Sequence, residues 1–332
     1  MTGLEQYWYR TSPAHLILLP ASWIFGALSA LRRLLYRSHI LESFKLPVPV
    51  VVIGNISVGG TGKTPLTLAI AEQLARQGYR PAIISRGYGG NHIQQAVTEN
   101  SLAQEVGDEP LLMAKRNICP VWVGKDRVAT ARQVLTAHPQ CDVLLCDDGL
   151  QHYRLQRDME IAVIDGVRRF GNRHLLPAGP LRESVSRLNT VDAVVINGGQ
   201  NIPGLKNQYA MQLSGNIFHN LHHPGKIAGA EQFGRLRQHA AAGIGNPQRF
   251  FAHLTSLGLR FIPHAFADHH LYQASDLNFD ECDALFLTEK DAVKCMAFAD
   301  DRFWVLRVDA QVDPALLNHL LRKIAIHGCK TA

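Results

Sequence analysis

The segment GNISVGGTGKTP, residues 54–65, has the residue types that bind a phosphate chain. Its glycines let backbone N–H groups turn toward phosphate oxygens, and a helix that begins near Lys63 adds its positive N-terminal dipole. Lys63 can reach the β and γ phosphates of a nucleotide, and Thr64 can ligate Mg²⁺. We therefore predict that the nucleotide is bound by Gly59, Gly60, Thr61, Gly62, Lys63 and Thr64.

The loop departs from the general P-loop pattern, which places a glycine five positions before Gly62, where this chain has Ser57. The flanks still fit. The run VPVVVIGN (48–55) predicts a buried strand, and residues 63–78 carry apolar side chains on one helical face. The alternative is a glycine-rich turn with an incidental lysine. The motif does not identify the base of the nucleotide.

A phosphate loop needs a further acidic group to hold Mg²⁺. In DVLLCDDGLQH (142–152), apolar residues run into Asp147 and Asp148 at the carboxyl end of a predicted strand. Two adjacent carboxylates repel one another unless a cation or hydrogen-bond donors offset them. We predict that Thr64, Asp147 and Asp148 bind the metal; the alternative is an acidic turn. The two motifs together predict phosphoryl transfer from a magnesium-bound nucleoside triphosphate.

Kinases and switch ATPases share these motifs, so the acceptor side must discriminate between them. A kinase needs a base near the acceptor hydroxyl. The segment VGDEPLL (106–112) offers Asp108 at a helix start, and FADHHLY (266–272) offers His269 and His270. From residue types alone, Asp108 can also be a helix cap and the histidines can be structural.

Three further histidines lie close together in the sequence, at His219, His222 and His223. They hint at a metal site, but no cysteine or carboxylate in this stretch completes one. We interpret them as the solvated end of an antiparallel ribbon over residues 209–220.

An α/β architecture must position these residues. From Leu46 onward, short β-rich runs alternate with helical patterns, which predicts a mostly parallel P-loop NTPase-like sheet with helices on both faces. The pattern then resumes on a smaller scale. We expect a cleft between the carboxyl ends of the two sheets, where open α/β sheets bind ligands. The expected divisions are an N-terminal helical segment (1–40), a P-loop kinase domain (41–220) and a smaller α/β domain (221–332).

Composition narrows the class of partner only slightly. The chain has 332 residues and a formal net charge of +6, which suits nucleic acid, anionic lipid or nucleotide phosphates equally. Its six cysteines show no CxxC pairing, and several lie in apolar runs. This usage favours a reducing, cytosolic location.

Residues 16–31 form an apolar run with basic residues on both sides. The run is shorter than the roughly 20 residues that span a bilayer, and Pro20 interrupts it. A signal peptide is disfavoured because no small-residue cleavage site is followed by a disulfide-rich chain. Two interpretations remain: a helix buried on the protein's own core, or an interfacial helix with aromatic side chains and arginines at the lipid headgroups.

Eight segments, in this order, resemble the tetraacyldisaccharide 4'-kinase family, the lipid A 4'-kinases of Gram-negative bacteria: GNISVGGTGKTP, SRGYGG, VGDEP, GKDR, DDGLQH, GPLRE, FADHH and TEKDAVK. GGTGKTP is shared with many NTPases, whereas the combination of VGDEP, DDGLQH and TEKD is specific. The resemblance implies transfer of the γ-phosphate of ATP to the 4'-hydroxyl of a tetraacylated, 1-phosphorylated glucosamine disaccharide, giving lipid IVA. The family's P-loop has the same displaced glycines, so Ser57 is ordinary there.

The resemblance also implies roles for single residues. Asp108 takes the role of catalytic base, supported by His269 across the cleft, and Asp147 with Asp148 takes that of the metal-binding pair. His152 lies near that pair in the sequence and is a weaker candidate for assisting it.

Two arginines and the TEKD segment are further candidates. Arg86 and Arg182 suit anionic substrate or ATP phosphates, because a guanidinium matches phosphate geometry. The resemblance places Glu289, Lys290 and Asp291 at nucleotide contacts or at closure of the cleft.

The implied acceptor has four acyl chains, and exposing each CH₂ to water costs about 0.8 kcal/mol, so the enzyme must come to the membrane. The expected partners are this glycolipid, ATP, Mg²⁺ and the cytoplasmic face of the bacterial inner membrane, which the protein meets as a peripheral or monotopic protein. We expect no nucleic acid and no obligatory protein partner. The rival functions are a membrane-associated switch ATPase that regulates a protein, and a soluble small-molecule kinase or ligase whose first helix is buried.

Overall fold

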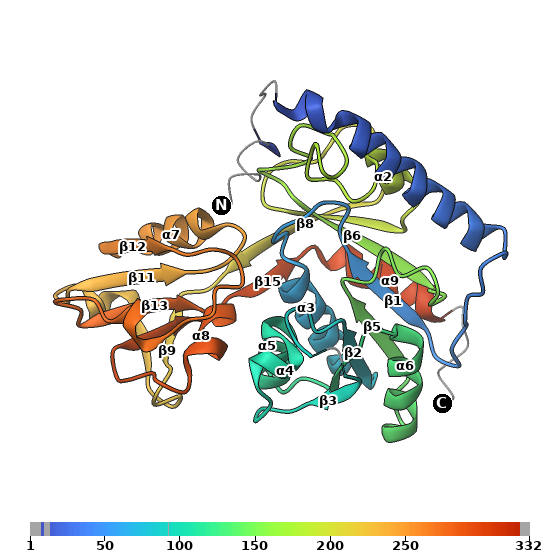
Figure 1. Cartoon of the computed structure of the whole chain (residues 1–332). Helices are drawn as coiled ribbons and strands as arrows, with labels where there is room; N and C mark the ends of the chain where they lie inside the picture. The colour runs from blue at the N-terminus through green and yellow to red at the C-terminus, as the bar shows by residue number, and fades with distance from the viewer. Residues whose placement is uncertain (1–7, 10–13, 92, 326–332) are drawn as a thin grey trace.

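The computed structural model describes residues 8–9, 14–91 and 93–325, which form two α/β bodies and a long N-terminal helix, α2 (Ala14–Arg37) (Figure 1). We call the body around the larger sheet the large lobe (residues 44–214 and 309–325) and the body around the smaller sheet the small lobe (residues 217–306).

The sheet of the large lobe has the strand order β15-β8-β7-β6-β1-β5-β2-β4-β3. The strands from β8 to β4 are parallel to their neighbours, and the two edge strands are antiparallel. The strand bounds are β1 (Val50–Gly54), β2 (Pro81–Ser85), β3 (Gln95–Val97), β4 (Val121–Val123), β5 (Val143–Asp147), β6 (Met159–Asp165), β7 (Ala193–Asn197), β8 (Gln208–Ser214) and β15 (Asp309–Val312).

Apolar layers cover both faces of this sheet. Along β1, Val51 and Ile53 belong to one layer, and Val50 and Val52 belong to the other. A strand that is apolar on both sides in this way must be buried on both, as the run at residues 48–55 predicted. The first layer contains α3 (Lys63–Arg76), α4 (Ala103–Val106), α5 (Asp108–Lys115) and α9 (Pro314–Ala325), and the second contains α6 (Arg127–Ala137) and η1 (Val185–Asn189). The predicted fold class is confirmed.

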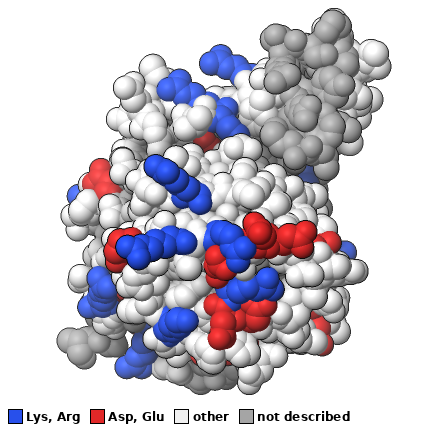
Figure 2. All heavy atoms as spheres, turned by 90° about the vertical axis from the view of Figure 1, so that its left-hand side faces the viewer, with Lys and Arg blue, Asp and Glu red and all other residues white. Residues whose placement is uncertain are grey.

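The sheet of the small lobe has the strand order β10-β9-β14-β13-β11-β12. Its four strands from β14 to β12 are parallel, and apolar clusters again lie on both faces. The bounds are β9 (Ile217–Asn220), β10 (Ile227–Gly229), η2 (Ala230–Phe233), β11 (Gln238–Ala242), α7 (Pro247–Ser256), β12 (Phe261–Ala265), η3 (Ala274–Leu277), β13 (Ala284–Thr288), α8 (Glu289–Cys295) and β14 (Phe303–Leu306). Figure 2 views this lobe from its outer end, where basic and acidic side chains are interspersed.

The connection between the lobes differs from the predicted ribbon. Strand β8 pairs with β7 and β15, and β9 pairs with β14 and β10, so residues 209–220 do not fold back on themselves and the prediction of a ribbon there is wrong. The chain instead passes straight between the lobes beside the returning segment. A Cβ on Gly215 would lie 1.9 Å from the carbonyl oxygen of Arg307, so the close approach of the two connections requires a glycine.

The predicted division of the chain is also partly wrong. Residues 309–325, which we assigned to the smaller domain, return to the large lobe as β15 and α9. The physical reason is the apolar face of α9, since Leu316, Leu320 and Ile324 are buried in the core of the large lobe. The predicted boundary between residues 220 and 221 is a few residues late, because β9 begins at Ile217 and already belongs to the small sheet.

The N-terminal helix α2 (Ala14–Arg37) runs along the outside of the large lobe (Figure 1). Pro20 lies inside this 24-residue helix, so the prediction that it interrupts the segment is wrong. A proline removes one helical hydrogen bond, and the surrounding turns continue. By length and composition Leu16–Arg37 could cross a membrane, and only 6% of its most apolar window is buried, which contradicts the buried-helix interpretation.

A narrow face of α2 holds it to the protein. Ser22 is buried and its hydroxyl donates to the carbonyl oxygen of Leu175 at 2.5 Å. A Cβ on Gly26 would lie 2.7 Å from the side chain of Leu175. The opposite side exposes large apolar residues to solvent, namely Leu16, Ile17, Trp23, Ile24, Leu28, Leu31 and Leu34.

Candidate active site

The predicted phosphate loop lies between the carboxyl end of β1 and the start of α3. Gly59 and Gly62 have φ angles of 100° and 94°, in the left-handed region that favours glycine. Gly62 also permits a close contact, because a Cβ there would lie 2.4 Å from Nδ2 of Asn197. Glycine is therefore favoured at both positions by the backbone conformation, and at Gly62 also by the lack of room for a side chain.

Ser57 has a physical explanation. It forms an isolated antiparallel bridge with Leu181, and the neighbouring Val58 donates its N–H to Pro180 O at 2.8 Å. The first half of the loop thus runs alongside residues 180–182 of the GPLRE segment. An extended, paired residue needs no glycine, which is why the general pattern is broken here.

The two predicted metal-binding aspartates have different environments. Asp147 is fully buried at the end of β5 and accepts a hydrogen bond from Thr67 Oγ1 at 3.1 Å. Burial, together with the charge of Glu109, raises the pKa of Asp147 to about 7. Asp148 has a left-handed backbone with φ 48°. Burial alone would raise the pKa of Asp148, but the cations Lys63 and Arg182 lower it to about 2.

Magnesium fits Asp147 better than Asp148. Oδ2 of Asp147 is buried and has no hydrogen-bond partner among the described residues. An unpartnered buried carboxylate oxygen is costly unless a cation or donor meets it, and Mg²⁺ prefers oxygen ligands. Asp148 is already 3.5 Å from Lys63 Nζ, and Arg182 donates to it at 3.2 Å. Thr64 is buried in the first turn of α3.

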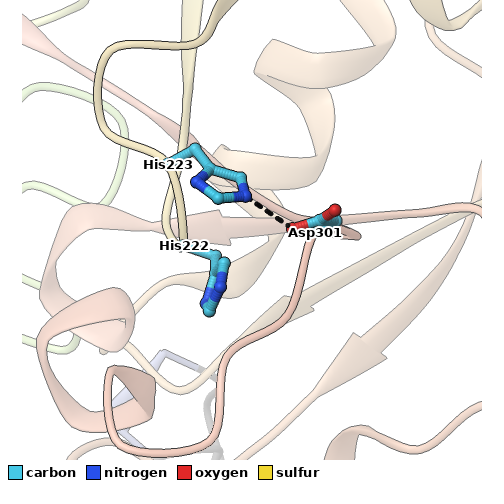
Figure 3. Close-up of side chains that lie close together, drawn as sticks. All are labelled: His222, His223 and Asp301. Carbon is cyan, nitrogen blue, oxygen red and sulfur yellow. Dashed lines mark ion pairs between the residues drawn. The ribbon is translucent and has the colours of Figure 1, made fainter.

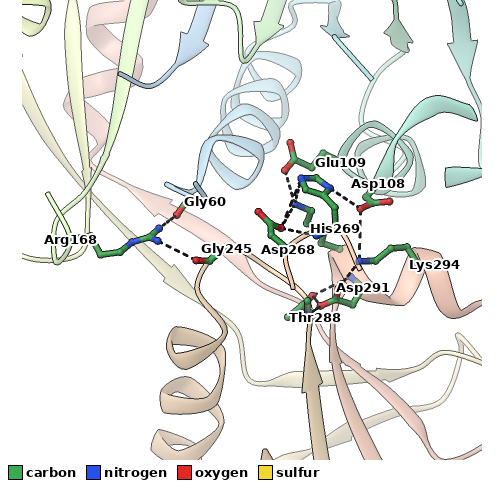
Figure 4. A network of polar contacts seen from close by, with 12 residues as sticks. Gly60, Asp108, Glu109, Arg168, Gly245, Asp268, His269, Thr288, Asp291 and Lys294 are labelled. Atoms are coloured by element: carbon green, nitrogen blue, oxygen red, sulfur yellow. Dashed lines mark hydrogen bonds and ion pairs between the residues drawn. The ribbon is translucent and has the colours of Figure 1, made fainter. Parts of the chain in front are cut away.

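Three side chains that the sequence did not single out support the loop: Asn197 and Arg168 bind its backbone, and Arg249 binds Asn197. Asn197, fully buried at the end of β7, donates to Thr61 O at 2.9 Å and accepts from Arg249 Nη2 at 2.6 Å. Arg168 donates to Gly60 O at 2.7 Å and to Gly245 O at 3.2 Å (Figure 4). A signal was present for Asn197, because a polar residue directly follows an apolar run at the carboxyl end of a strand.

The small lobe touches the phosphate loop directly. The segment after β11 reaches Gly60, and a Cβ on Gly245 would lie 2.9 Å from the backbone nitrogen of Gly60. Since β1 and β11 both end here, the carboxyl ends of the two sheets face one another, as expected for a ligand cleft.

Asp108 and His269 meet across this cleft. Asp108 is buried at the start of α5, and its Oδ2 is 3.2 Å from Nδ1 of His269 (Figure 4). A carboxylate oxygen only accepts hydrogen bonds, so in a neutral imidazole this contact places the proton on Nδ1. Nε2 is then the acceptor for Lys290 Nζ, which lies 3.3 Å away. His269 has φ 60°, a strained conformation for a residue with a side chain, which is typical of functional sites.

Two lysines of α8 complete the contact between the lobes. Lys290 Nζ lies 3.1 Å from Glu109 and 3.2 Å from Asp268. Burial opposes the charge of Lys290, but these two carboxylates raise its pKa. Lys294 Nζ is 3.8 Å from Asp108 and 2.8 Å from Asp291. The cluster therefore pairs two lysines of the small lobe with acids of both lobes.

The TEKD residues engage protein groups. Glu289 Oε2 binds Arg116 of the large lobe at 2.8 Å, and Asp291 is fully buried, where it accepts from Gly243 N at 3.0 Å and from Thr288. The Glu289 contact joins the two lobes, whereas the contacts of Asp291 lie within the small lobe. The nucleotide-binding role of Glu289, Lys290 and Asp291 stays a prediction.

The three weaker candidates lie in different settings. Arg86 is exposed after β2 and has no hydrogen bond or ion pair with the described residues, whereas Arg182 binds Asp148. Burial, with Arg127 nearby, lowers the pKa of His152 to about 4, so its imidazole is neutral. Nε2 of His152 is buried without a hydrogen-bond partner among the described residues, and no ion pair joins His152 to Asp147 or Asp148 there.

The chain closely resembles known proteins over nearly its whole length. The family described as tetraacyldisaccharide-1-P 4'-kinase matches residues 14–325. A protein named tetraacyldisaccharide 4'-kinase from Methylobacillus flagellatus is 49% identical over 322 residues, covering 97% of this chain and 95% of that protein. One of the same name from Janthinobacterium sp. (strain Marseille) is 50% identical over 333 residues, with the same coverage.

A solved structure has the same fold. The crystal structure of LpxK from Aquifex aeolicus in complex with ATP has a TM-score of 0.80 and 28% sequence identity, covering 94% of this chain and 99% of that one. The family match, the relatives and this structure agree with one another. This chain belongs to the tetraacyldisaccharide 4'-kinase family.

Proposed function

We propose that this protein transfers the γ-phosphoryl group of ATP to the 4'-hydroxyl of a tetraacyldisaccharide 1-phosphate, forming lipid IVA for lipid A biosynthesis. Membership of the family supports the substrates. The structural observation that carries the proposal is the pairing of Asp108 with His269 across the cleft that contains the phosphate loop. A switch ATPase has no need of a base directed at an acceptor hydroxyl.

We propose that Asp108 takes the proton of the acceptor hydroxyl. His269 and Lys294 both lie on its Oδ2 side, at 3.2 and 3.8 Å, so Oδ1 is available to the sugar hydroxyl. As the 4'-oxygen bonds to the γ-phosphorus, the bond between that phosphorus and the β–γ bridging oxygen breaks and ADP leaves. The hydroxyl proton passes to Asp108, and His269 keeps the carboxylate oriented.

The phosphate loop handles the other substrate. Lys63 lies 3.5 Å from Asp148, close enough to exchange this partner for the β and γ phosphates. The loop N–H groups and the start of α3 add the positive field of a helix N-terminus. Asp147, Thr64 and less directly Asp148 would hold Mg²⁺, which offsets charge on the transferring phosphoryl group. Closure of the small lobe excludes water, which competes as an acceptor.

We infer that α2 brings the cleft to the cytoplasmic surface of the inner membrane. The exposed side of the helix offers Ile17, Trp23, Ile24 and Leu28 to the acyl region, and arginines follow at its end. Such a surface suits an acceptor that stays in the bilayer. Replacing Ile17, Ile24 and Leu28 by glutamine should reduce vesicle binding about tenfold while the melting temperature is retained, because these side chains are exposed.

The direct test is incubation of the purified protein with γ-labelled ATP, Mg²⁺ and the disaccharide monophosphate in mixed micelles. The proposal expects label on the glycolipid, and the label should disappear in the Lys63→Ala variant. Release of labelled inorganic phosphate without labelled lipid would contradict it, and stimulation of that release by a protein would support a switch ATPase.

A further inference from the structure

A second group of polar side chains lies in the small lobe, on the turn after β9 and on the segment before β14 (Figure 3). It contains His222, His223 and Asp301, and all three are exposed. One ligand atom from each lies within 4.8 Å of the others. The sequence around the histidines contains no carboxylate, and the fold supplies one from a distant part of the chain.

One buried side chain fixes the backbone of all three residues. Asn220 is 1% exposed, and its Oδ1 accepts the backbone N–H groups of His222 at 3.1 Å and His223 at 2.8 Å. Its Nδ2 donates to the carbonyl oxygen of Asp301 at 2.8 Å. The two chain segments therefore hold a fixed relative position, which lowers the entropic cost of binding a ligand between them.

The hydrogen bonding of His222 also prepares a ligand atom. Its Nδ1 is 3.2 Å from Ala299 O. A carbonyl oxygen only accepts, so Nδ1 carries the proton and the neutral ring keeps its lone pair on Nε2. Histidines that bind metals commonly donate their other N–H to a backbone carbonyl in this way.

The spacing of the remaining pair is close to that of metal ligands. His223 Nε2 lies 3.1 Å from Asp301 Oδ1, and the dashed line in Figure 3 marks this pair. Two ligand atoms about 2.1 Å from a tetrahedral ion are about 3.4 Å apart. The exposed His222 side chain offers the third ligand atom, within 4.8 Å of the other two.

We propose that His222, His223 and Asp301 bind one divalent transition-metal ion. Two imidazole nitrogens and one carboxylate oxygen suit Zn²⁺, Cu²⁺, Ni²⁺ or Co²⁺, whereas Mg²⁺ and Ca²⁺ require mainly oxygen ligands. Because the three side chains are exposed, water occupies the remaining positions. The ion would link the turn after β9 to the segment before β14 and so stabilise the small lobe by mass action.

The test titrates the full chain with Zn²⁺ in competition with a chromophoric chelator, and with Co²⁺ while the visible absorption spectrum is recorded. Asp301→Asn and His223→Gln should each weaken Zn²⁺ binding at least about tenfold and abolish the Co²⁺ spectrum. Binding should also weaken between about pH 7.5 and about pH 5.5, because protons compete for the imidazoles. The control is His39→Gln, which removes an exposed histidine elsewhere.

Melting in the absence of metal should be the same for all of these proteins, which separates lost ligands from lost folding. The proposal is wrong if the unaltered chain takes up no Zn²⁺ in excess metal. It is also wrong if Asp301→Asn and His223→Gln bind Zn²⁺ as tightly as the control and keep its Co²⁺ spectrum.

Discussion

The two lobes contribute to the cleft in different ways. On the large-lobe side, Asp147 and Asn197 are fully buried at the ends of parallel strands. Each forms a hydrogen bond within that lobe, and Asn197 also accepts one from Arg249 of the small lobe. On the small-lobe side, Asp268 and His269 lie in a loop, their side chains are 29% and 30% exposed, and their partners are charged groups.

This contrast separates two tasks. The phosphate loop and its acidic neighbours come from one lobe, so we expect the large lobe to bind nucleotide before the lobes meet. The pair that we propose for the acceptor proton is divided, because Asp108 belongs to the large lobe and His269 to the small one. With these proposed roles, phosphoryl transfer requires closure of the lobes, whereas nucleotide binding does not.

The largest expected effect is that of Asp108→Asn. The amide cannot take the hydroxyl proton, so kcat should fall about 10²- to 10⁴-fold, while ATP affinity should stay within about threefold. Phosphate transfer and equilibrium nucleotide binding are the two measurements. The control is Asp280→Asn, an exposed aspartate of the small lobe. Loss of ATP binding in Asp108→Asn would show that Asp108 is structural. It would contradict the proposal that separate residues serve nucleotide binding and proton transfer.

Asp147→Asn tests the buried acidic residue of the large lobe. Loss of its negative charge should lower kcat about 10²-fold and raise the Mg²⁺ concentration needed for half-maximal rate. Asp148→Asn is the matched variant, and we expect a smaller change in Mg²⁺ requirement because Asp148 already binds Lys63 and Arg182. The reverse order would make Asp148 the principal metal ligand.

Gly245→Ala tests closure. The added methyl group would lie 2.9 Å from the Gly60 nitrogen, so the small lobe must stand away from the phosphate loop. A small misplacement of this kind should lower kcat/KM about tenfold with little change in ATP affinity. Gly225→Ala is the control, because a Cβ there meets no atom within 4 Å. Equal rates for the two variants would show that contact between Gly245 and the loop is dispensable.

The smallest effect concerns His152. Its folded pKa is about 4 and its ordinary value is 6.5, so below pH 6.5 the unfolded state binds more protons. Stability is thus lost as the pH falls from 6.5 toward 4, and His152→Gln should reduce this loss. Thermal unfolding across that range, compared with His39→Gln, measures the difference. Parallel curves for both variants would mean that His152 is protonated normally in the folded state.

Much of the large lobe could be predicted from the sequence, because its signals are local. The run into Gly54, the glycines of the loop and the two aspartates at the end of β5 lie at fixed offsets from strand ends. Hydrophobic patterning locates such strands, and the carboxyl ends of parallel strands converge at one edge of the sheet. The family resemblance, and not spacing, singled out Asp108 and His269.

Other features could not be predicted because they depend on partners far away in the chain. The return of β15 and α9 to the large lobe and the pairing of β9 with β14 give no local signal. The same holds for Arg168 and Arg249, whose guanidinium groups bind the phosphate loop and Asn197. Arginines are common on surfaces, and residue type does not reveal which ones reach a backbone oxygen.

By itself, the sequence determined the alternation of strands and helices, the phosphate loop and the apolar character of residues 16–31. These follow from backbone freedom at glycine and from hydrophobic periodicity, which act over a few residues. Only the tertiary structure decided that α2 exposes its apolar side, that Asp108 meets His269 and that Asp301 joins two histidines. Contacts of this kind depend on how whole lobes pack, since side-chain interactions act over a few ångströms whatever the separation along the chain.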